Sequence, residues 1–154
     1  MELREAENMA RELLSKHKLD VQGWSFEFDN AKRRFGSCQY RLKKITLSRS
    51  LVALNDEQEV KDTILHEIAH ALAPRGSHHN RTWQITALAI GCNGSRCYSS
   101  SDVVVVPKSF KGTCPCCGKE VERYRRTEIA CGKCCRKYNG GKYSKEYSLK
   151  WRRV

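Results

Sequence analysis

Two histidines flank a glutamate in the segment TILHEIAHALAPRGSHHNRTW, residues 63–83. His66 and His70 are four residues apart, so an α-helix places both on one face, where both imidazoles can reach one metal ion. Glu67 lies beside this pair and can accept a proton from a metal-bound water without binding the metal itself. Zinc with three protein ligands keeps a fourth position for water and lowers the pKa of that water to about 7. The HExxH segment therefore predicts a helix with a catalytic zinc site suited to peptide-bond hydrolysis.

The residues around the motif fit such a helix. Asn55 or Asp56 can cap its start, and Glu59 completes a capping box with Asp56. Pro74 ends it. Its buried face is predicted from four apolar residues at i, i+4 spacing: Val60, Ile64, Ile68 and Leu72. This stripe leaves both histidines of the motif off the buried face.

The third zinc ligand is expected from the histidines that follow the helix. His78 and His79 both follow the end of the helix at Pro74, where the chain can turn back toward the motif. Gly76 stands where the longer pattern H-E-x-x-H-x-x-G-x-x-H has its last histidine, so the sequence does not predict a metzincin. The residues alone leave His78 and His79 as alternatives.

The rest of the first 106 residues predicts further helices around a small sheet. Residues 2–18 have the apolar spacing of an amphipathic helix, and residues 49–54 and 80–90 are predicted as shorter helices. Three segments alternate apolar and polar residues, as strands with one buried face do: Trp24, Phe26 and Phe28; Cys38, Tyr40 and Leu42; Ile45 and Leu47. We expect a small, mostly antiparallel sheet. The run DVVVV at residues 102–106 is predicted as a further strand.

Six of the nine cysteines fall between residues 114 and 135. They include two C-x2-C pairs separated by thirteen residues: Cys114 with Cys117, and Cys131 with Cys134. This spacing predicts one tetrahedral structural zinc, and Cys117 is preferred to Cys116 because it makes the x2 spacing and precedes a glycine. Cys116 and Cys135 are then spare thiols. The remaining cysteines fit neither zinc site: Cys38 is predicted as a buried strand residue, and Cys92 and Cys97 as free thiols on a loop.

The positive charge is concentrated in the same region. Residues 1–110 hold 16 Lys and Arg against 13 Asp and Glu, whereas residues 111–154 hold 13 against 4, so 9 of the formal +12 charges lie there. Such a basic surface suits phosphates, so DNA is the expected partner, and nearby aromatic residues could stack on the bases of a single strand. The sequence does not decide between single- and double-stranded DNA. The predicted DNA-binding residues are Arg125, Arg126, Lys150, Arg152 and Arg153. The aromatic residues available for stacking or for covering the zinc are Tyr124, Tyr138, Tyr143, Tyr147 and Trp151.

The run RRFGSCQYRLKKITLSRSLVALNDEQEVKDTILHEIAHAL, followed by HNRTW, resembles the SprT-like metalloproteases, whose eukaryotic relative Spartan is a DNA-dependent protease. The resemblance covers most of residues 20–90 and continues into the cysteine segment. It implies that the third ligand is a histidine with an aromatic residue four positions later, which fits His79 and Trp83. Asn80 departs from the family, which usually has glycine there; asparagine tolerates a left-handed backbone better than most residues.

The sequence therefore predicts an α+β fold: a zincin-like, SprT-like domain at residues 1–106 with a small antiparallel sheet and the HExxH helix, then a basic zinc ribbon at residues 107–154. The expected cofactors are one catalytic and one structural Zn²⁺. The expected activity is that of a zinc endopeptidase, and the resemblance implies cleavage of DNA-bound or crosslinked proteins in DNA repair. No apolar run reaches the roughly 18 residues that cross a bilayer, and no signal peptide is evident, so we expect a DNA-associated, cytoplasmic protein that is not secreted.

Two alternatives remain from the sequence. One is a non-catalytic, zinc-containing nucleic-acid-binding protein, against which the carboxylate beside the histidines argues. The other is a zincin that cleaves small peptides and uses the ribbon only for stability. The group that would stabilise the tetrahedral oxyanion is not identified, and Tyr40, Arg41 and His78 are the candidates.

Overall fold

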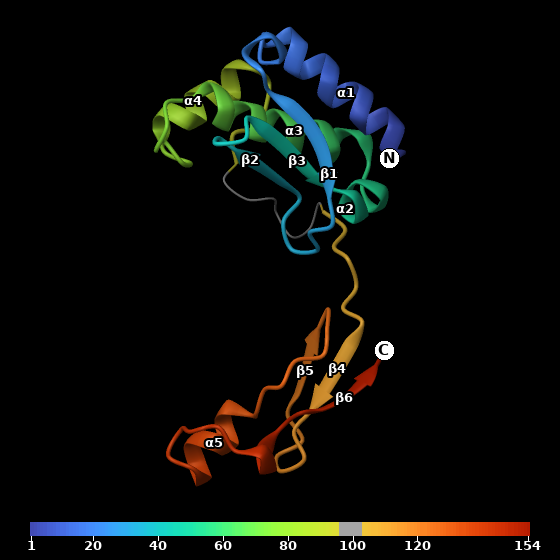
Figure 1. Cartoon of the computed structure of the whole chain (residues 1–154), viewed down its shortest axis with the longest axis vertical. Coiled ribbons are helices and arrows are strands. Elements are labelled where there is room, and N and C mark those ends of the chain that lie inside the picture. Colours follow the sequence, from blue (N-terminus) through green and yellow to red (C-terminus); the bar gives the residue numbers. More distant parts are fainter. Residues whose placement is uncertain (96–102) are drawn as a thin grey trace. The chain divides into compact units, whose positions relative to one another are not determined.

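The computed structural model describes residues 1–95 and 103–154, and the chain forms two compact units, Met1–Val106 and Pro107–Val154 (Figure 1). Among the described residues, no helix combines the length and the apolar character needed to cross a membrane. Cys97, which the sequence predicted to be a free thiol, lies outside the described residues.

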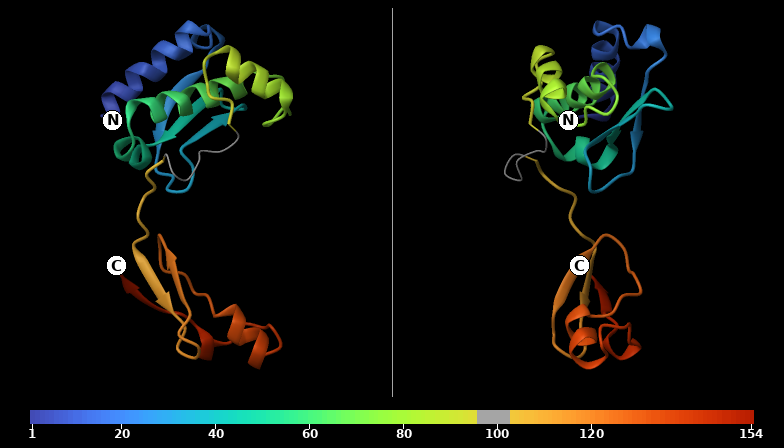
Figure 2. Two further views of the ribbon diagram at one scale, coloured as in Figure 1. Left: turned by 180° about the vertical axis from the view of Figure 1, so that it is seen from behind. Right: turned by 90° about the vertical axis from the view of Figure 1, so that its left-hand side faces the viewer.

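The first unit contains helices α1 (Leu3–Lys16), α2 (Arg49–Leu54), α3 (Glu57–Leu72) and α4 (Arg81–Ala89), a short 3-10 helix (Asp20–Gln22), and strands β1 (Ser25–Asp29), β2 (Gly36–Gln39) and β3 (Lys44–Ser48). The helices lie close to where the sequence predicted them. Helix α1 contacts both α3 and β1, and α3 also contacts β2, β3 and α4 (Figure 2). The motif helix α3 is therefore held between the sheet and the other helices.

The sheet of this unit has the order β1-β3-β2 and is mixed, not antiparallel. β2 pairs with β3 antiparallel, whereas β1 pairs with the other edge of β3 in parallel. The alternation of apolar residues locates strands, but it does not decide which edge a strand joins. The expectation of antiparallel pairing was therefore wrong for β1.

The core confirms most of the predicted buried stripes. Its α1 residues are Ala6, Ala10 and Leu14, and its α3 residues are Val60, Ile64 and Ile68. Leu72, at the last position of α3, is 37% exposed and does not belong to this core. Leu42 is 66% exposed because it lies in the turn between β2 and β3 and not in a strand.

Residues 103–106 do not form the predicted strand. The side-chain amide of Asn55 donates a hydrogen bond to the Val104 carbonyl at 2.9 Å, and its oxygen accepts one from the Val104 N–H at 2.7 Å. One side chain thus pairs both backbone groups that a neighbouring strand would otherwise pair. Val103 still lies in the core, so its apolar character was interpreted correctly but its secondary structure was not.

The second unit contains strands β4 (Phe110–Thr113), β5 (Glu120–Arg123) and β6 (Lys150–Arg153), helix α5 (Gly132–Tyr138) and a 3-10 helix (Lys145–Tyr147). The strands form an antiparallel sheet in the order β5-β4-β6. A single strand, β5, follows the first cysteine pair and pairs with β4, which lies before that pair. The buried cluster of this unit consists of Cys114, Cys131, Cys134, Cys135 and Tyr147.

Candidate active site and metal centre

Three histidines converge at the end of the motif helix. The Nε2 atom of His79 lies 3.0 Å from Nε2 of His66 and 3.1 Å from Nε2 of His70. His66 and His70 come from successive turns of α3, as their spacing predicted. One nitrogen from each ring lies within 4.8 Å of the others, which suits a single metal ion with room for a further ligand.

The turn before α4 brings His79 to this place. His78 adopts the left-handed conformation, with φ of 46°, and the N–H of Asn80 donates to the Ser77 carbonyl at 2.9 Å. Asn80 itself is extended, with φ of −76°, and its side chain caps α4 by accepting from the Trp83 N–H at 3.1 Å. The left-handed residue is therefore His78, and the asparagine that departs from the family is the N-cap of α4.

Trp83 packs against all three histidine rings. Its indole is 1% exposed, and its ring centroid lies 4.7 Å from that of His66, 5.2 Å from His70 and 4.7 Å from His79. The His70 ring is stacked on the indole, and the His79 ring stands nearly perpendicular to it. A rigid aromatic surface thus holds the three imidazoles in a fixed arrangement.

The environment keeps His66 and His70 neutral. Burial, followed by the nearby charge of His79, lowers the pKa of His66 to about 4, although a hydrogen bond with the backbone of Ser95 opposes the shift. Burial and the neighbouring histidines lower the pKa of His70 to about 4. At neutral pH both rings are uncharged, which is the form that binds a metal ion.

Glu67 is buried beside the histidines, with only 7% of its surface exposed. Burial raises the pKa of its carboxyl group to about 8, against the opposing effects of the Arg34 charge and of a hydrogen bond with the backbone of Cys38. Burial is the main cause that raises the pKa of the Cys38 thiol to about 12, and the charge of Glu67 adds to this shift. Glu67 therefore faces strand β2, in a pocket where a proton can be held as well as released.

A glycine in β2 makes room for this carboxylate. A Cβ atom added at Gly36 would lie 2.7 Å from Glu67 Oε1 and 2.8 Å from Glu67 Cγ. A Cβ atom essentially never makes contacts this short, so any side chain at position 36 displaces Glu67 or separates β2 from α3. Sequence analysis missed this requirement because nothing in the local pattern distinguishes Gly36 from an ordinary turn glycine.

Replacing Gly36 with alanine is therefore expected to destabilise the first unit by about 1–3 kcal/mol and to displace the Glu67 carboxylate. The free energy of unfolding, measured in denaturant, checks the first effect. Gly76→Ala is a comparison without the close contact: an added Cβ there has no neighbour within 4 Å, and its φ of 84° makes backbone strain the source of any destabilisation. A Gly36→Ala protein at least as stable as the wild type would contradict this close contact.

The three candidates for the oxyanion-stabilising group lie in different places. The Tyr40 hydroxyl donates to the His70 carbonyl at 3.0 Å, so it supports the last turn of α3. Arg75 lies over the Tyr40 ring with its Cζ 5.9 Å from the ring centroid. Arg41 and His78 are exposed, the first in the turn after β2 and the second in the turn before α4. Of these three, Tyr40 hydrogen-bonds to the backbone of His70, and the charge of His78 is one cause that lowers the pKa of His70.

The four predicted cysteine ligands also converge. The sulfurs of Cys114 and Cys134 are 3.8 Å apart, those of Cys117 and Cys131 are 3.7 Å apart, and all four lie within 4.8 Å of one another. Hydrogen bonding to the backbone N–H of Cys134 is the main cause that lowers the pKa of Cys131 to about 6, which favours the thiolate form. Of the two remaining thiols in this unit, Cys116 is exposed and Cys135 is buried. This donor set fits a tetrahedral zinc ion.

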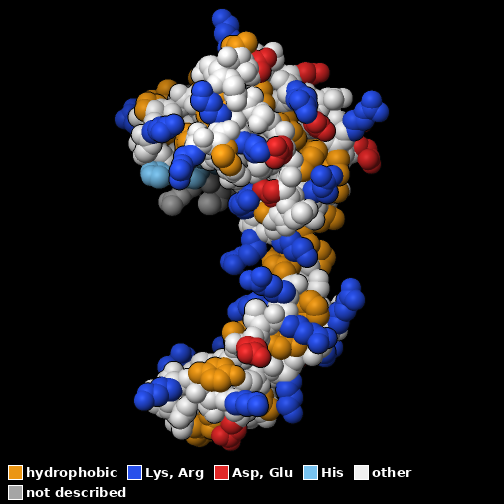
Figure 3. All heavy atoms as spheres, in the orientation of Figure 1, with side chains coloured by type: hydrophobic (Ala, Val, Ile, Leu, Met, Phe, Trp, Pro, Cys, Tyr) orange, Lys and Arg blue, Asp and Glu red, His pale blue; other side chains and the backbone are white. Residues whose placement is uncertain are grey.

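The basic residues of the second unit lie on both faces of its sheet. Paired residues share a face, so Phe110, Arg123 and Arg153 lie together, whereas Lys111, Glu122 and Arg152 lie on the other face. Arg126 stacks over Phe110, with its Cζ 5.4 Å from the ring centroid, and Trp151 lies over Gly112. Lys150 shares the face of Arg152, and Arg125 is exposed in the segment after β5. The five predicted DNA-binding residues therefore do not form one surface. Figure 3 shows many more Lys and Arg than Asp and Glu side chains on the visible side of this unit.

Comparison with known proteins places the first unit in a family. Residues 5–102 match the SprT-like family. The crystal structure of the metallopeptidase zymogen of Methanocaldococcus jannaschii jannalysin is similar with a TM-score of 0.46 and 18% sequence identity, over 63% of this chain and 85% of that chain. Comparison with curated proteins gives no match. The family match covers well over half of the sequence, so the chain belongs to the SprT-like metalloprotease family.

Proposed function

We propose that this SprT-like protein is a zinc-dependent endopeptidase that cleaves proteins bound or crosslinked to DNA. One observation carries the catalytic part: one nitrogen from each of three histidines converges within 4.8 Å, and a buried carboxylate lies next to two of them on α3. A purely structural metal site has no need for a buried ionisable group next to its ligands, because burying a carboxylate costs free energy. This argument favours hydrolysis over the non-catalytic alternative.

In this proposal His66, His70 and His79 hold the zinc ion, and Trp83 fixes the orientation of their rings. The bound ion supplies Lewis-acid activation of water and of the substrate carbonyl. Glu67 takes a proton from the attacking water and later gives it to the leaving amine, as a general base and then a general acid. The burial that raises the pKa of Glu67 suits both steps, since its carboxyl group can be either protonated or ionised near neutral pH.

The second unit supports the DNA-associated part of the proposal. Residues 107–154 hold 14 Lys and Arg against 4 Asp and Glu. A zinc ion bound by four thiolates would carry a net charge of about −2, which still leaves this unit strongly basic. Its cysteine ligands Cys114, Cys117, Cys131 and Cys134 would hold a structural zinc. Cationic side chains next to Phe110 and Trp151 combine charge with aromatic surface, as single-strand-binding proteins do.

A cleavage assay tests this proposal. The zinc-loaded protein is incubated with a DNA-binding protein substrate, with and without single-stranded DNA, and the products are separated on a gel. Fragments that depend on DNA support the whole proposal. Fragments that form equally without DNA reduce it to a general zincin, and the absence of fragments in both conditions favours the non-catalytic, nucleic-acid-binding alternative.

Neutralising the predicted DNA-binding residues Arg125, Arg126, Lys150, Arg152 and Arg153 with glutamine is expected to weaken single-stranded DNA binding by about tenfold or more at low salt. The slope of affinity against salt concentration should fall, because each lost phosphate contact removes about 0.7 from it. Fluorescence anisotropy over a range of salt concentrations measures both. The matched control replaces five exposed cations of the first unit, Arg4, Lys16, Lys18, Arg33 and Lys61. Equal affinity of the two variants for DNA would contradict the assignment of the DNA-binding surface to these five residues of the ribbon.

A further inference from the structure

The charges of the first unit are separated along the chain. Residues 1–106 hold 15 Lys and Arg against 13 Asp and Glu, so the unit as a whole is almost neutral. Twelve of these 13 carboxylates belong to residues 1–29 and 56–67. Residues 30–55 and 68–95 hold nine Lys and Arg and no Asp or Glu. These two basic segments form β2, β3, α2, the end of α3 and α4, and they include the turn that carries the third histidine.

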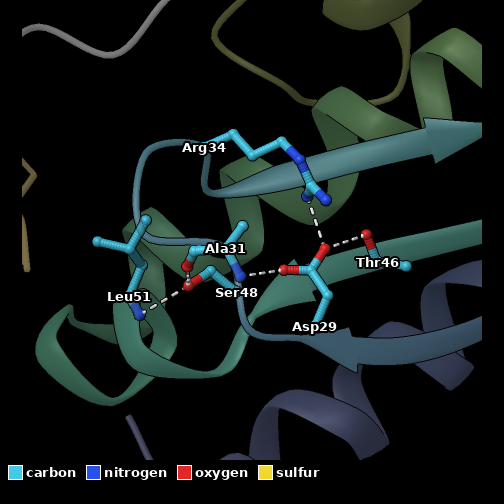
Figure 4. A network of polar contacts seen from close by, with 6 residues as sticks. All are labelled: Asp29, Ala31, Arg34, Thr46, Ser48 and Leu51. Atoms are coloured by element: carbon cyan, nitrogen blue, oxygen red, sulfur yellow. Dashed lines mark hydrogen bonds and ion pairs between the residues drawn. The ribbon is translucent and has the colours of Figure 1, made fainter. Parts of the chain in front are cut away.

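Two of these nine cations are paired with carboxylates of β1. Arg34 donates to Asp29 Oδ2 at 2.6 Å, within the network of polar contacts in Figure 4. Lys44 Nζ lies 2.7 Å from Glu27 Oε1. Three exposed arginines have no carboxylate within ion-pair distance among the residues that the structure describes: Arg41, Arg75 and Arg81. We call these three the rim arginines.

The rim arginines flank the histidine site. Arg41 follows Tyr40, whose hydroxyl donates to the His70 carbonyl at 3.0 Å. Arg75 lies over the Tyr40 ring, with its Cζ 5.9 Å from the ring centroid. Arg81 begins α4, directly after the turn that brings in the third histidine. Figure 3 shows Lys and Arg side chains next to the visible histidines, whereas the Asp and Glu side chains in view lie farther away.

The charge of this rim indicates what it can bind. Proteins that bind DNA carry positive surfaces, so the rim would repel the substrates of the proposed function if they approached without DNA. A DNA strand carries a negative charge at intervals of about 3.4 Å, so a strand beside the site would offset this repulsion and bring its bound protein with it. Arginine suits this contact, because its planar guanidinium can bind a phosphate through two parallel hydrogen bonds. The rim therefore fits DNA better than an acidic protein.

We propose that the rim arginines bind phosphates of the DNA that carries the substrate, so that the first unit itself contacts DNA beside the histidine site. This inference rests on the proposed function, which assigns DNA binding to the second unit. It adds a second DNA contact, on the unit that holds the catalytic residues. The DNA is then part of what the site recognises, together with the protein bound to it.

The triple variant Arg41→Gln, Arg75→Gln and Arg81→Gln tests this contact in the full, zinc-loaded chain. Its affinity for a single-stranded oligonucleotide is expected to fall by about fivefold or more at low salt, and the slope of affinity against salt concentration by about 2, because each lost phosphate contact removes about 0.7. Fluorescence anisotropy over a range of salt concentrations measures both. Replacing the same three residues with lysine should restore most of the affinity, because lysine also binds phosphate as a point charge.

The matched control carries Arg4→Gln, Lys16→Gln and Lys18→Gln, which removes the same charge from exposed positions in and next to α1 of the same unit. Its affinity should change by less than about twofold, because charges far from the bound strand are largely screened by salt. Equal losses in the two glutamine variants would overturn the proposal, and so would a loss in the rim variant that lysine does not restore. If polyglutamate displaced the oligonucleotide as readily as unlabelled DNA of equal charge, the rim would not be selective for DNA, which would also overturn it.

These measurements do not depend on hydrolysis. A rim variant that loses affinity, in a protein that cleaves nothing, would locate the failure in the proposed catalytic function. A wild type that binds DNA, with both glutamine variants unchanged, would remove only the rim contact and leave DNA binding to the ribbon. A wild type that binds no DNA would contradict both the DNA-associated part of the proposed function and this inference.

Discussion

Glu67→Gln is expected to lower kcat/KM for peptide hydrolysis by about 10²- to 10⁴-fold, the range that a general acid–base group contributes. Glutamine has nearly the same shape and fits beside Gly36, but it cannot accept a proton from water. The three histidines are unchanged, so the variant should bind zinc as the wild type does. Steady-state hydrolysis of a fluorogenic peptide measures the first effect, and metal analysis of the same preparation measures the second.

The zinc content of the Glu67→Gln protein separates the possible explanations of a loss of activity. An inactive Glu67→Gln protein that has also lost zinc would show only that the site had been disrupted. A zinc-loaded variant with wild-type activity would contradict the general-base role, and with it the main argument for catalysis. Cys38→Ser is a useful control in the same pocket, because it alters a side chain near Glu67 that has no role in the proposed chemistry.

Cys134→Ser is expected to unfold the second unit while leaving the first unit folded. The buried cluster of residues 107–154 consists of four cysteines and Tyr147, so little apolar core remains without the metal. Structural zinc sites supply an apparent binding free energy of about 10–16 kcal/mol at neutral pH, and in such small domains this is largely folding free energy. Metal analysis should fall from two zinc ions per chain to one. Heteronuclear NMR should show loss of dispersed signals from residues 107–154 only.

Cys116→Ser is the matched control, because Cys116 is exposed and lies outside the four-sulfur group. This variant should keep both zinc ions and a folded second unit. If Cys134→Ser also kept two ions, the ligand set would be different, with Cys116 or Cys135 as the replacement. If the wild type bound one ion or none, the assignment of two metal sites to this chain would be wrong.

The histidine and cysteine groups were predictable because their spacing is local. A helix brings residues four apart onto one face, and two C-x2-C pairs leave few other partners. The helices were predictable for similar reasons, since Asp56 caps α3 through Glu59 N–H at 3.0 Å as the capping box predicts. The family resemblance was needed to choose His79, and the structure brings that residue, not His78, to the other two histidines.

The features that were missed depend on contacts between distant parts of the sequence. Asn55 replaces a neighbouring strand for Val104, which lies 49 residues later, and no local pattern shows that such a partner exists. The parallel pairing of β1, the space that Gly36 leaves for Glu67 and the placement of Arg34 by Asp29 likewise arise only when the chain has folded. Arg152 and Arg153 lie on opposite faces of the sheet because they are neighbours in strand β6, and the sequence alone did not identify this strand.

Hydrolysis by the histidine site can be tested directly with oxygen-labelled water. The zinc-loaded protein is incubated with a DNA-bound protein substrate in water enriched in heavy oxygen, and the fragments are analysed by mass spectrometry. A zinc peptidase should produce fragments whose new carboxyl groups carry the label, and these should disappear with Glu67→Gln. Labelled fragments formed equally by the wild type and the Glu67→Gln variant, or no labelled fragments from the zinc-loaded wild type, would contradict the assignment of peptide hydrolysis to this site.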